Sequence, residues 1–168
     1  MALAFVGLGS NLAHPRRQIA RAVRALSRLP RSTLVRVSPH FATAPVGAPG
    51  PQPDYVNAVA IVRTALPPRA LLARMHAIER RQQRRRDAQT PRNAPRTLDL
   101  DLLLYERRRS AGTSPLLPHP RMHERAFVLL PLSRLAPAAV IPGRGLARRH
   151  LRAVRSQAAR PTRSHHLA

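Results

Sequence analysis

The stretch from Pro95 to Tyr105 constrains the fold more than any other part of this chain, because it combines a strict alternation with two acidic residues. Leucine occupies every second position from Leu98 to Leu102, which is the pattern of a β-strand with one face in a hydrophobic core. Asp99 and Asp101 therefore share the opposite face. Residues two apart on a strand lie about 6 to 7 Å apart, so their carboxylates can converge on one divalent cation or on a pair of them.

Spacing alone leaves a second interpretation open, because paired aspartates also occur on solvated strand faces where water or arginine is sufficient. The chain contains only 7 Asp and Glu residues against 30 basic ones, all of them Arg. Two like charges on one strand face repel each other unless a counter-charge lies beside them. Arg96 stands close by, but a divalent cation would supply that charge best.

The composition predicts one domain, since 168 residues with 43% hydrophobic side chains can bury a sizeable core. A formal net charge of +23 would ordinarily indicate a polyanionic partner such as nucleic acid. Because Lys is absent, the arginine excess looks instead like the coding bias of a GC-rich genome. It also suits a phosphate-rich small ligand, which the guanidinium fork can bind through two hydrogen bonds.

The absence of cysteine excludes disulfides and thiolate metal sites, and it suits a reducing compartment. No apolar run approaches the roughly 18 residues of a membrane span, and the first residues lack the charged start of a signal peptide. We therefore expect a cytoplasmic protein that does not contact membranes.

The periodicity of the rest of the chain predicts the order strand, helix, strand, strand, helix, strand. The expected strands cover residues 3–8, 33–43 with a break near Pro39, 54–64 and the aspartate-bearing stretch. The expected helices cover 15–29, the segment from Pro67 to Glu79, 122–130 with a continuation over 132–135, and 146–154. Residues 44–53 are rich in Pro and Gly and should form a loop. Residues 1–154 would form the domain, and 155–168, which have no periodicity, a disordered tail.

Three further features have both a structural and a functional interpretation. Residues 80–96 are rich in Arg and poor in apolar side chains, which is typical of a solvated helix end but also of a mobile, phosphate-gathering lid. Asn57 lies in mid-strand, where it either bonds locally, as the residues alone favour, or binds the edge of a ligand. His119 stands between two prolines that fix its direction. A lone histidine is usually structural or exposed, and the fixed flanks favour a functional role only modestly.

Taken together, these stretches resemble the 6-hydroxymethyl-7,8-dihydropterin pyrophosphokinase family of folate biosynthesis, over about residues 3–151. The segments that carry the resemblance are, in order, Gly9-Ser10-Asn11, Thr43-Ala44-Pro45-Val46-Gly47, Pro53-Asp54-Tyr55-Val56-Asn57-Ala58, Pro95-Arg96-Thr97-Leu98-Asp99-Leu100-Asp101, Leu117-Pro118-His119 and Arg125-Ala126-Phe127. The resemblance rests on their co-occurrence at these spacings, since no single motif carries it.

The resemblance implies a ferredoxin-like α+β fold, with an antiparallel sheet flanked by helices in a single domain. It also implies transfer of pyrophosphate from ATP to the pterin hydroxymethyl group, with AMP as the other product and two Mg²⁺ ions as cofactors. By carry-over, the catalytic residues are Arg84, Arg86, Arg96, Asp99 and Asp101, the last two as metal ligands; ATP is bound by Arg84, Arg96, His119 and Arg125; and the pterin pocket contains Thr43, Val46, Tyr55, Asn57 and Phe127. We expect a monomer that binds the dihydropterin and ATP and no specific nucleic acid.

Two alternatives from other classes stay open. A ferredoxin-like basic RNA-binding module would explain both fold and charge, but such modules stack bases on aromatic side chains, which are scarce at 3% of this chain. An inactive homologue would be expected to lose the metal ligands, whereas this chain keeps both Asp99 and Asp101.

Overall fold

A six-stranded antiparallel sheet forms the centre of the computed structural model, which describes residues 1–45, 50–82, 95–157 and 159–162. The strands are β1 Ala2–Ser10, β2 Ser32–Val37, β3 Phe41–Thr43, β4 Tyr55–Thr64, β5 Asp99–Tyr105 and β8 Ala159–Pro161. Their order is β5–β1–β4–β3–β8, and β2 pairs with the remaining length of β4. A separate hairpin joins β6 Val140–Ile141 to β7 Gly145–Leu146.

The long strand β4 pairs with two short strands along the same edge. Its first residues pair with β3, as in Phe41 opposite Asn57, and its last residues pair with β2. Between them Pro39 has no N–H to donate to the ladder, and the Ser38 hydroxyl accepts a hydrogen bond from the Val59 N–H at 2.9 Å. The predicted break near Pro39 is confirmed.

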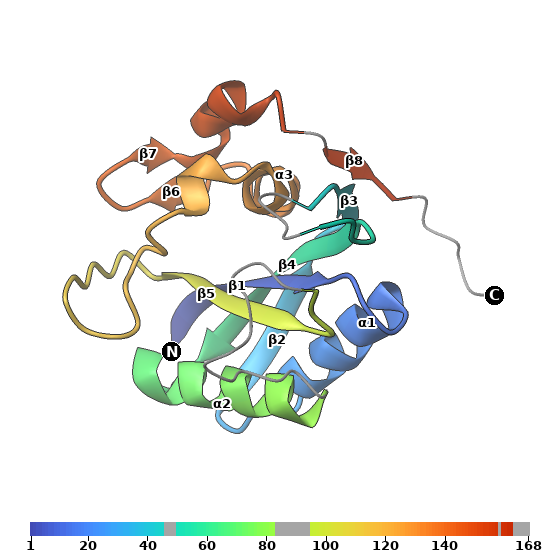
Figure 1. The fold of residues 1–168 in the computed structure, drawn as a ribbon. Helices are drawn as coiled ribbons and strands as arrows, with labels where there is room; N and C mark the ends of the chain where they lie inside the picture. Colours follow the sequence, from blue (N-terminus) through green and yellow to red (C-terminus); the bar gives the residue numbers. More distant parts are fainter. Residues whose placement is uncertain (46–49, 83–94, 158, 163–168) are drawn as a thin grey trace.

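Helices cover both faces of the sheet (Figure 1). The helices α1 Pro15–Leu26 and α2 Pro68–Arg81 lie on one face, and α3 Ala126–Leu135 lies on the other with the 3₁₀ helices η1 Met122–Glu124 and η2 Ala147–Val154. Alternate residues of β4 contribute to two cores, with Ala58 and Ala60 on the side of α1 and α2, and Val59 and Ile61 on the side of α3. This is the predicted antiparallel sheet flanked by helices, in one small domain.

The strand β5, which carries the two aspartates, is fixed along both edges. On one edge it pairs with β1, which places Asp99 opposite Gly9 and Asp101 opposite Gly7. On the other edge the buried Glu79 carboxylate of α2 accepts a hydrogen bond from the Leu100 N–H at 2.8 Å. The predicted alternation is confirmed, since Leu100 is buried between two partly exposed aspartates.

The segment around Arg125 differs from the continuous helix predicted over residues 122–130. Arg125 has an extended backbone, with φ −120° and ψ 110°, and it separates η1 from α3. The helical periodicity of the sequence runs through this residue and therefore conceals the break. The predicted continuation past Pro131 is confirmed, because α3 runs to Leu135 with Pro131 inside it.

The segment after Arg155 differs from the predicted disordered tail. Ala159–Pro161 forms β8, in which Ala159 lies opposite Thr43 and Pro161 opposite Phe41. Strand addition to an exposed sheet edge uses backbone hydrogen bonds and needs no hydrophobic periodicity, which is why the sequence pattern did not reveal it. Residues 163–168 lie outside the described residues. Within the described ranges, no helix is long and apolar enough to cross a membrane.

Candidate active site

A cavity of about 500 Å³ lies between the sheet and the beginning of α3. Its floor is formed by β1, β4 and β5, and its walls by β3, by the segment around His119 and by the first turn of α3. This volume is in the range of pockets that hold cofactors and small molecules.

The cavity brings together every predicted site residue that the structure describes. These residues are Thr43, Tyr55, Asn57, Arg96, Asp99, Asp101, His119, Arg125 and Phe127. The predicted residues Val46, Arg84 and Arg86 lie outside the described residues, as does most of the predicted arginine-rich lid. Segments far apart in the sequence thus meet at one place on the sheet.

Two arginines supply the counter-charge that the paired aspartates require. The Arg96 guanidinium forms a salt bridge with Asp99, and Nη1 of Arg125 lies 3.8 Å from Oδ2 of Asp101. Burial alone would lower the pKa of Arg96, but the Asp99 charge and hydrogen bond raise it above its ordinary value. The side chains of Asp99 and Asp101 remain 20% and 32% exposed, so the carboxylates are accessible from the cavity.

His119 carries no charge at neutral pH in this environment. Burial, together with the neighbouring charges of Arg125 and Arg121, lowers the pKa of its imidazole to about 4. Its Nδ1 accepts a hydrogen bond from the Arg121 N–H at 3.3 Å, which leaves the proton on Nε2. That nitrogen lies 3.9 Å from Oδ1 of Asp101, so His119 presents an N–H donor at the acidic edge of the cavity.

The turn after β1 holds Arg96 in place. Asn11, which is 1% exposed, accepts a hydrogen bond from the Arg96 N–H through Oδ1 at 2.8 Å and donates its own N–H to the Arg96 carbonyl at 3.0 Å. Its Nδ2 donates to Gln52 and to the Pro53 carbonyl. Asn11, directly after β1, therefore links the arginine and the segment that leads into β4.

A less charged part of the cavity lining is centred on Asn57 of β4. This residue is 5% exposed, and its Nδ2 donates to the Thr43 hydroxyl at 2.8 Å. A Cβ atom at Gly9 would lie 3.1 Å from Oδ1 of Asn57, so the glycine leaves room for the amide. Asn57 bonds locally, as the residues alone favoured, and it also lines the cavity, whereas binding to the edge of a ligand stays a prediction.

Phe127 forms an aromatic part of the wall at the start of α3. The Arg125 guanidinium carbon lies 5.5 Å from the centre of its ring, within the range of a cation–π contact. Arg125 thus contacts both the aromatic wall and the Asp101 carboxylate, and it connects the two ends of the cavity.

Three polar residues that line the cavity were not among the predicted site residues, namely Arg121, Glu124 and Gln157. Arg121 could have been suspected from its place two residues after His119. Glu124 precedes Arg125 but resembles any exposed helix residue, and Gln157 lies in a stretch without periodicity. Neither of these two carried a signal in the sequence.

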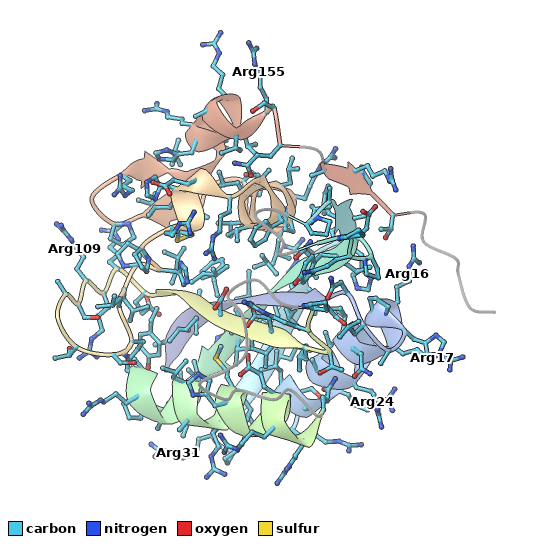
Figure 2. All side chains as sticks on the ribbon, in the orientation of Figure 1. Arg16, Arg17, Arg24, Arg31, Arg109 and Arg155 are labelled. Carbon is cyan, nitrogen blue, oxygen red and sulfur yellow. The ribbon has the colours of Figure 1, made fainter. Side chains whose placement is uncertain are left out.

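Arginines outside the cavity that are labelled in Figure 2 lie on several sides of the molecule. In Figure 2 the labelled side chains of Arg16, Arg24, Arg31, Arg109 and Arg155 point away from the fold on different sides. A nucleic-acid groove would instead need a basic stripe along one face.

The donor set of the cavity suits a hard cation that keeps ligands from outside the protein. Among the described residues, no three His, Cys, Asp or Glu side chains gather into a metal-binding group. Asp99 and Asp101 would therefore supply two carboxylates, with water or substrate oxygens completing the coordination. Mg²⁺ is commonly bound in this way, through one or two carboxylates, waters and phosphate oxygens.

Comparison with known proteins identifies relatives along most of the chain. The family model for 7,8-dihydro-6-hydroxymethylpterin-pyrophosphokinase (HPPK) matches residues 5–137. The 2-amino-4-hydroxy-6-hydroxymethyldihydropteridine pyrophosphokinase of Pseudomonas aeruginosa is 48% identical over 82% of this chain and 83% of its own. The protein of the same name from Haemophilus influenzae is 42% identical over 84% of this chain and 86% of its own.

Solved structures agree on the fold. A crystal structure of HPPK-DHPS in complex with substrates matches 90% of this chain with a TM-score of 0.68 at 13% identity. Plasmodium falciparum HPPK-DHPS matches 90% of this chain with a TM-score of 0.67 at 11% identity. The chain spans 43% and 44% of these longer chains, respectively. At such low identity, the likeness shows the fold alone.

Proposed function

The chain belongs to the 7,8-dihydro-6-hydroxymethylpterin-pyrophosphokinase (HPPK) family, and on that premise we propose that its cavity is where pyrophosphate passes from ATP to the hydroxymethyl group of the dihydropterin. The enzyme thus serves folate biosynthesis. The observation that carries this placement is that one cavity holds a charged edge, with Asp99 and Asp101, and an uncharged wall, with Asn57 and Phe127.

The two ends of the cavity suit the two substrates. Transfer of a phosphoryl-type group depends mainly on positioning and charge neutralisation, so the protein needs fixed charges more than a covalent nucleophile. Arg96, Arg125 and the Nε2–H of His119 would bind the triphosphate. Asn57 would hydrogen-bond to the edge of the pterin, which would lie against Phe127 and Tyr55.

The charged edge would also hold two Mg²⁺ ions on Asp99 and Asp101. When bound, Mg²⁺ neutralises phosphate oxygens and stabilises the charge that develops during transfer. Arg96, now paired with Asp99, would then be available to the triphosphate. The predicted Arg84 and Arg86 would act beside it, although they lie outside the described residues.

We expect turnover to require Mg²⁺, ATP and 6-hydroxymethyl-7,8-dihydropterin together. Chelation with EDTA should lower the rate at least about a hundredfold, because the phosphate charge would no longer be neutralised, and added Mg²⁺ should restore it. The measurement is the formation of AMP in a coupled assay, with pterin omitted as the control. An undiminished rate in EDTA would refute the metal assignment, and AMP formation without pterin would refute the assignment of the acceptor.

The variant Asn57→Ala should raise the dissociation constant of the pterin about 10- to 100-fold, because it removes a buried hydrogen-bonding group from the binding wall. The dissociation constant of ATP should stay within about twofold. Thr64→Val is the matched control, since Thr64 is buried on the same strand but does not line the cavity. Equal pterin affinity in the Asn57 variant and the wild type would assign Asn57 a purely structural role.

The RNA-binding alternative is not favoured, because the chain belongs to a pyrophosphokinase family and the arginines labelled in Figure 2 point to different sides of the fold. We also propose that the enzyme is a monomer. Its mass by sedimentation would test this. A cytoplasmic location stays a prediction, and localisation of a tagged chain would test it.

A further inference from the structure

The side-chain amide of Gln157 bonds to the backbone on both sides of Arg125. Its Oε1 accepts a hydrogen bond from the Ala126 N–H at 2.9 Å, and its Nε2 donates to the Glu124 carbonyl at 2.8 Å. One side chain from the C-terminal segment thereby satisfies the donor after Arg125 and the acceptor before it.

The backbone at Arg125 is held on one side by α3, because its carbonyl accepts hydrogen bonds from the Val128 and Leu129 N–H groups at 3.1 and 3.0 Å. Arg125 is extended between η1 and α3, and as the N-cap residue of α3 its side chain forms no capping hydrogen bond. The first N–H groups of a helix have no partner within the helix, and here Gln157 provides one for Ala126. Gln157 thus holds the peptide groups on either side of Arg125, while α3 holds its carbonyl, and both contribute to the direction in which the Arg125 side chain leaves the backbone.

The segment that carries Gln157 is itself anchored on both sides. Before it, the Gln157 N–H donates to the Val154 carbonyl at the end of η2 at 2.9 Å. After it, β8 pairs with β3, and Nη2 of Arg160 lies 3.2 Å from Oδ2 of Asp54. Because the segment is anchored before and after Gln157, the side chain of Gln157 can hold the backbone of residues 124–126 in one position.

We propose that Gln157 is a positioning residue for the pyrophosphoryl transfer, which fixes Arg125 and Phe127 at the junction of the triphosphate and pterin ends of the cavity. The inference rests on the proposed function, because it takes these two side chains to contact the substrates. Gln157 need not contact either substrate, and its effect passes through the backbone of residues 124–126.

Replacement of Gln157 by methionine tests this role, because Gln157→Met keeps the length of the side chain and removes both hydrogen bonds. We expect kcat/KM to fall about tenfold for each substrate, since a small misplacement of binding groups has effects of this size or more. The dissociation constants of ATP and the pterin should each rise several-fold. Hydrogen exchange at the Ala126 amide should become faster.

The matched control is Ser156→Ala, which changes the exposed neighbour and should leave all three quantities unchanged. Gln157→Ala serves as a second variant if the methionine side chain finds new contacts or prevents folding. A purely structural role would lower the thermal midpoint of unfolding while the folded enzyme kept wild-type dissociation constants, and that result would overturn the proposal. Failure of the wild type to turn over would instead count against the proposed function, so the two failures are distinguishable.

Discussion

Replacing Asp99 or Asp101 by asparagine should lower kcat about a thousandfold or more while the protein stays folded. Asparagine keeps the shape of the side chain but loses the charge that a cation requires. Metal ions contribute several kcal/mol of charge stabilisation to such reactions, and about 4 kcal/mol corresponds to a thousandfold in rate. Each variant should also need a much higher Mg²⁺ concentration for half-maximal rate.

The fold should tolerate these two changes for a reason visible in the cavity. Each aspartate faces an arginine at a partly exposed position, and such pairs contribute about 0 to 1 kcal/mol to stability. Thermal unfolding should therefore shift little. Glu106→Gln is the matched control, because it removes the same charge from an exposed turn after β5 and keeps an acceptor for the Leu3 N–H. Near-normal turnover of either aspartate variant in Mg²⁺ would contradict the metal assignment.

The strand around Asp99 and Asp101 shows what local pattern can predict. Its alternation depends only on which side chains are apolar, and a strand with one buried face must place the two aspartates together. The predicted strand over 54–64 likewise has its counterpart in β4, on which Tyr55 and Asn57, two residues apart, both line the cavity. The architecture followed from such elements, together with the family resemblance.

The same reasoning, which uses local pattern, could not predict contacts between distant segments. Gln157 acts through two backbone groups that any residue could supply, so neither partner carries a signal in the sequence. The β8 strand forms because the edge of β3 offers backbone groups, not because of its own composition. The break at Arg125 was hidden for a similar reason, since a single extended residue does not interrupt the helical periodicity around it.

The nucleotide product should be AMP and not ADP, which is the largest qualitative difference that the account predicts. In an ordinary kinase the acceptor oxygen attacks the terminal phosphorus, whereas here the pterin hydroxyl must lie in line with the β-phosphorus. Asp99 and Asp101 lie at the charged edge of the cavity, and Asn57 lies at the wall proposed to bind the pterin. Asp99 and Asp101 would hold the cations that neutralise phosphate charge, and Arg96 and Arg125 would neutralise the charge on AMP and on the transferred group. Family membership selects this arrangement over transfer of the terminal phosphate.

The most direct test of this account is separation of the products after the wild-type enzyme has reacted with ATP, Mg²⁺ and 6-hydroxymethyl-7,8-dihydropterin. Chromatography with mass detection should show one AMP for each pterin diphosphate formed, and a parallel reaction with Asp101→Asn should show almost neither. Stoichiometric ADP with a pterin monophosphate would contradict the account, even if the enzyme turned over rapidly.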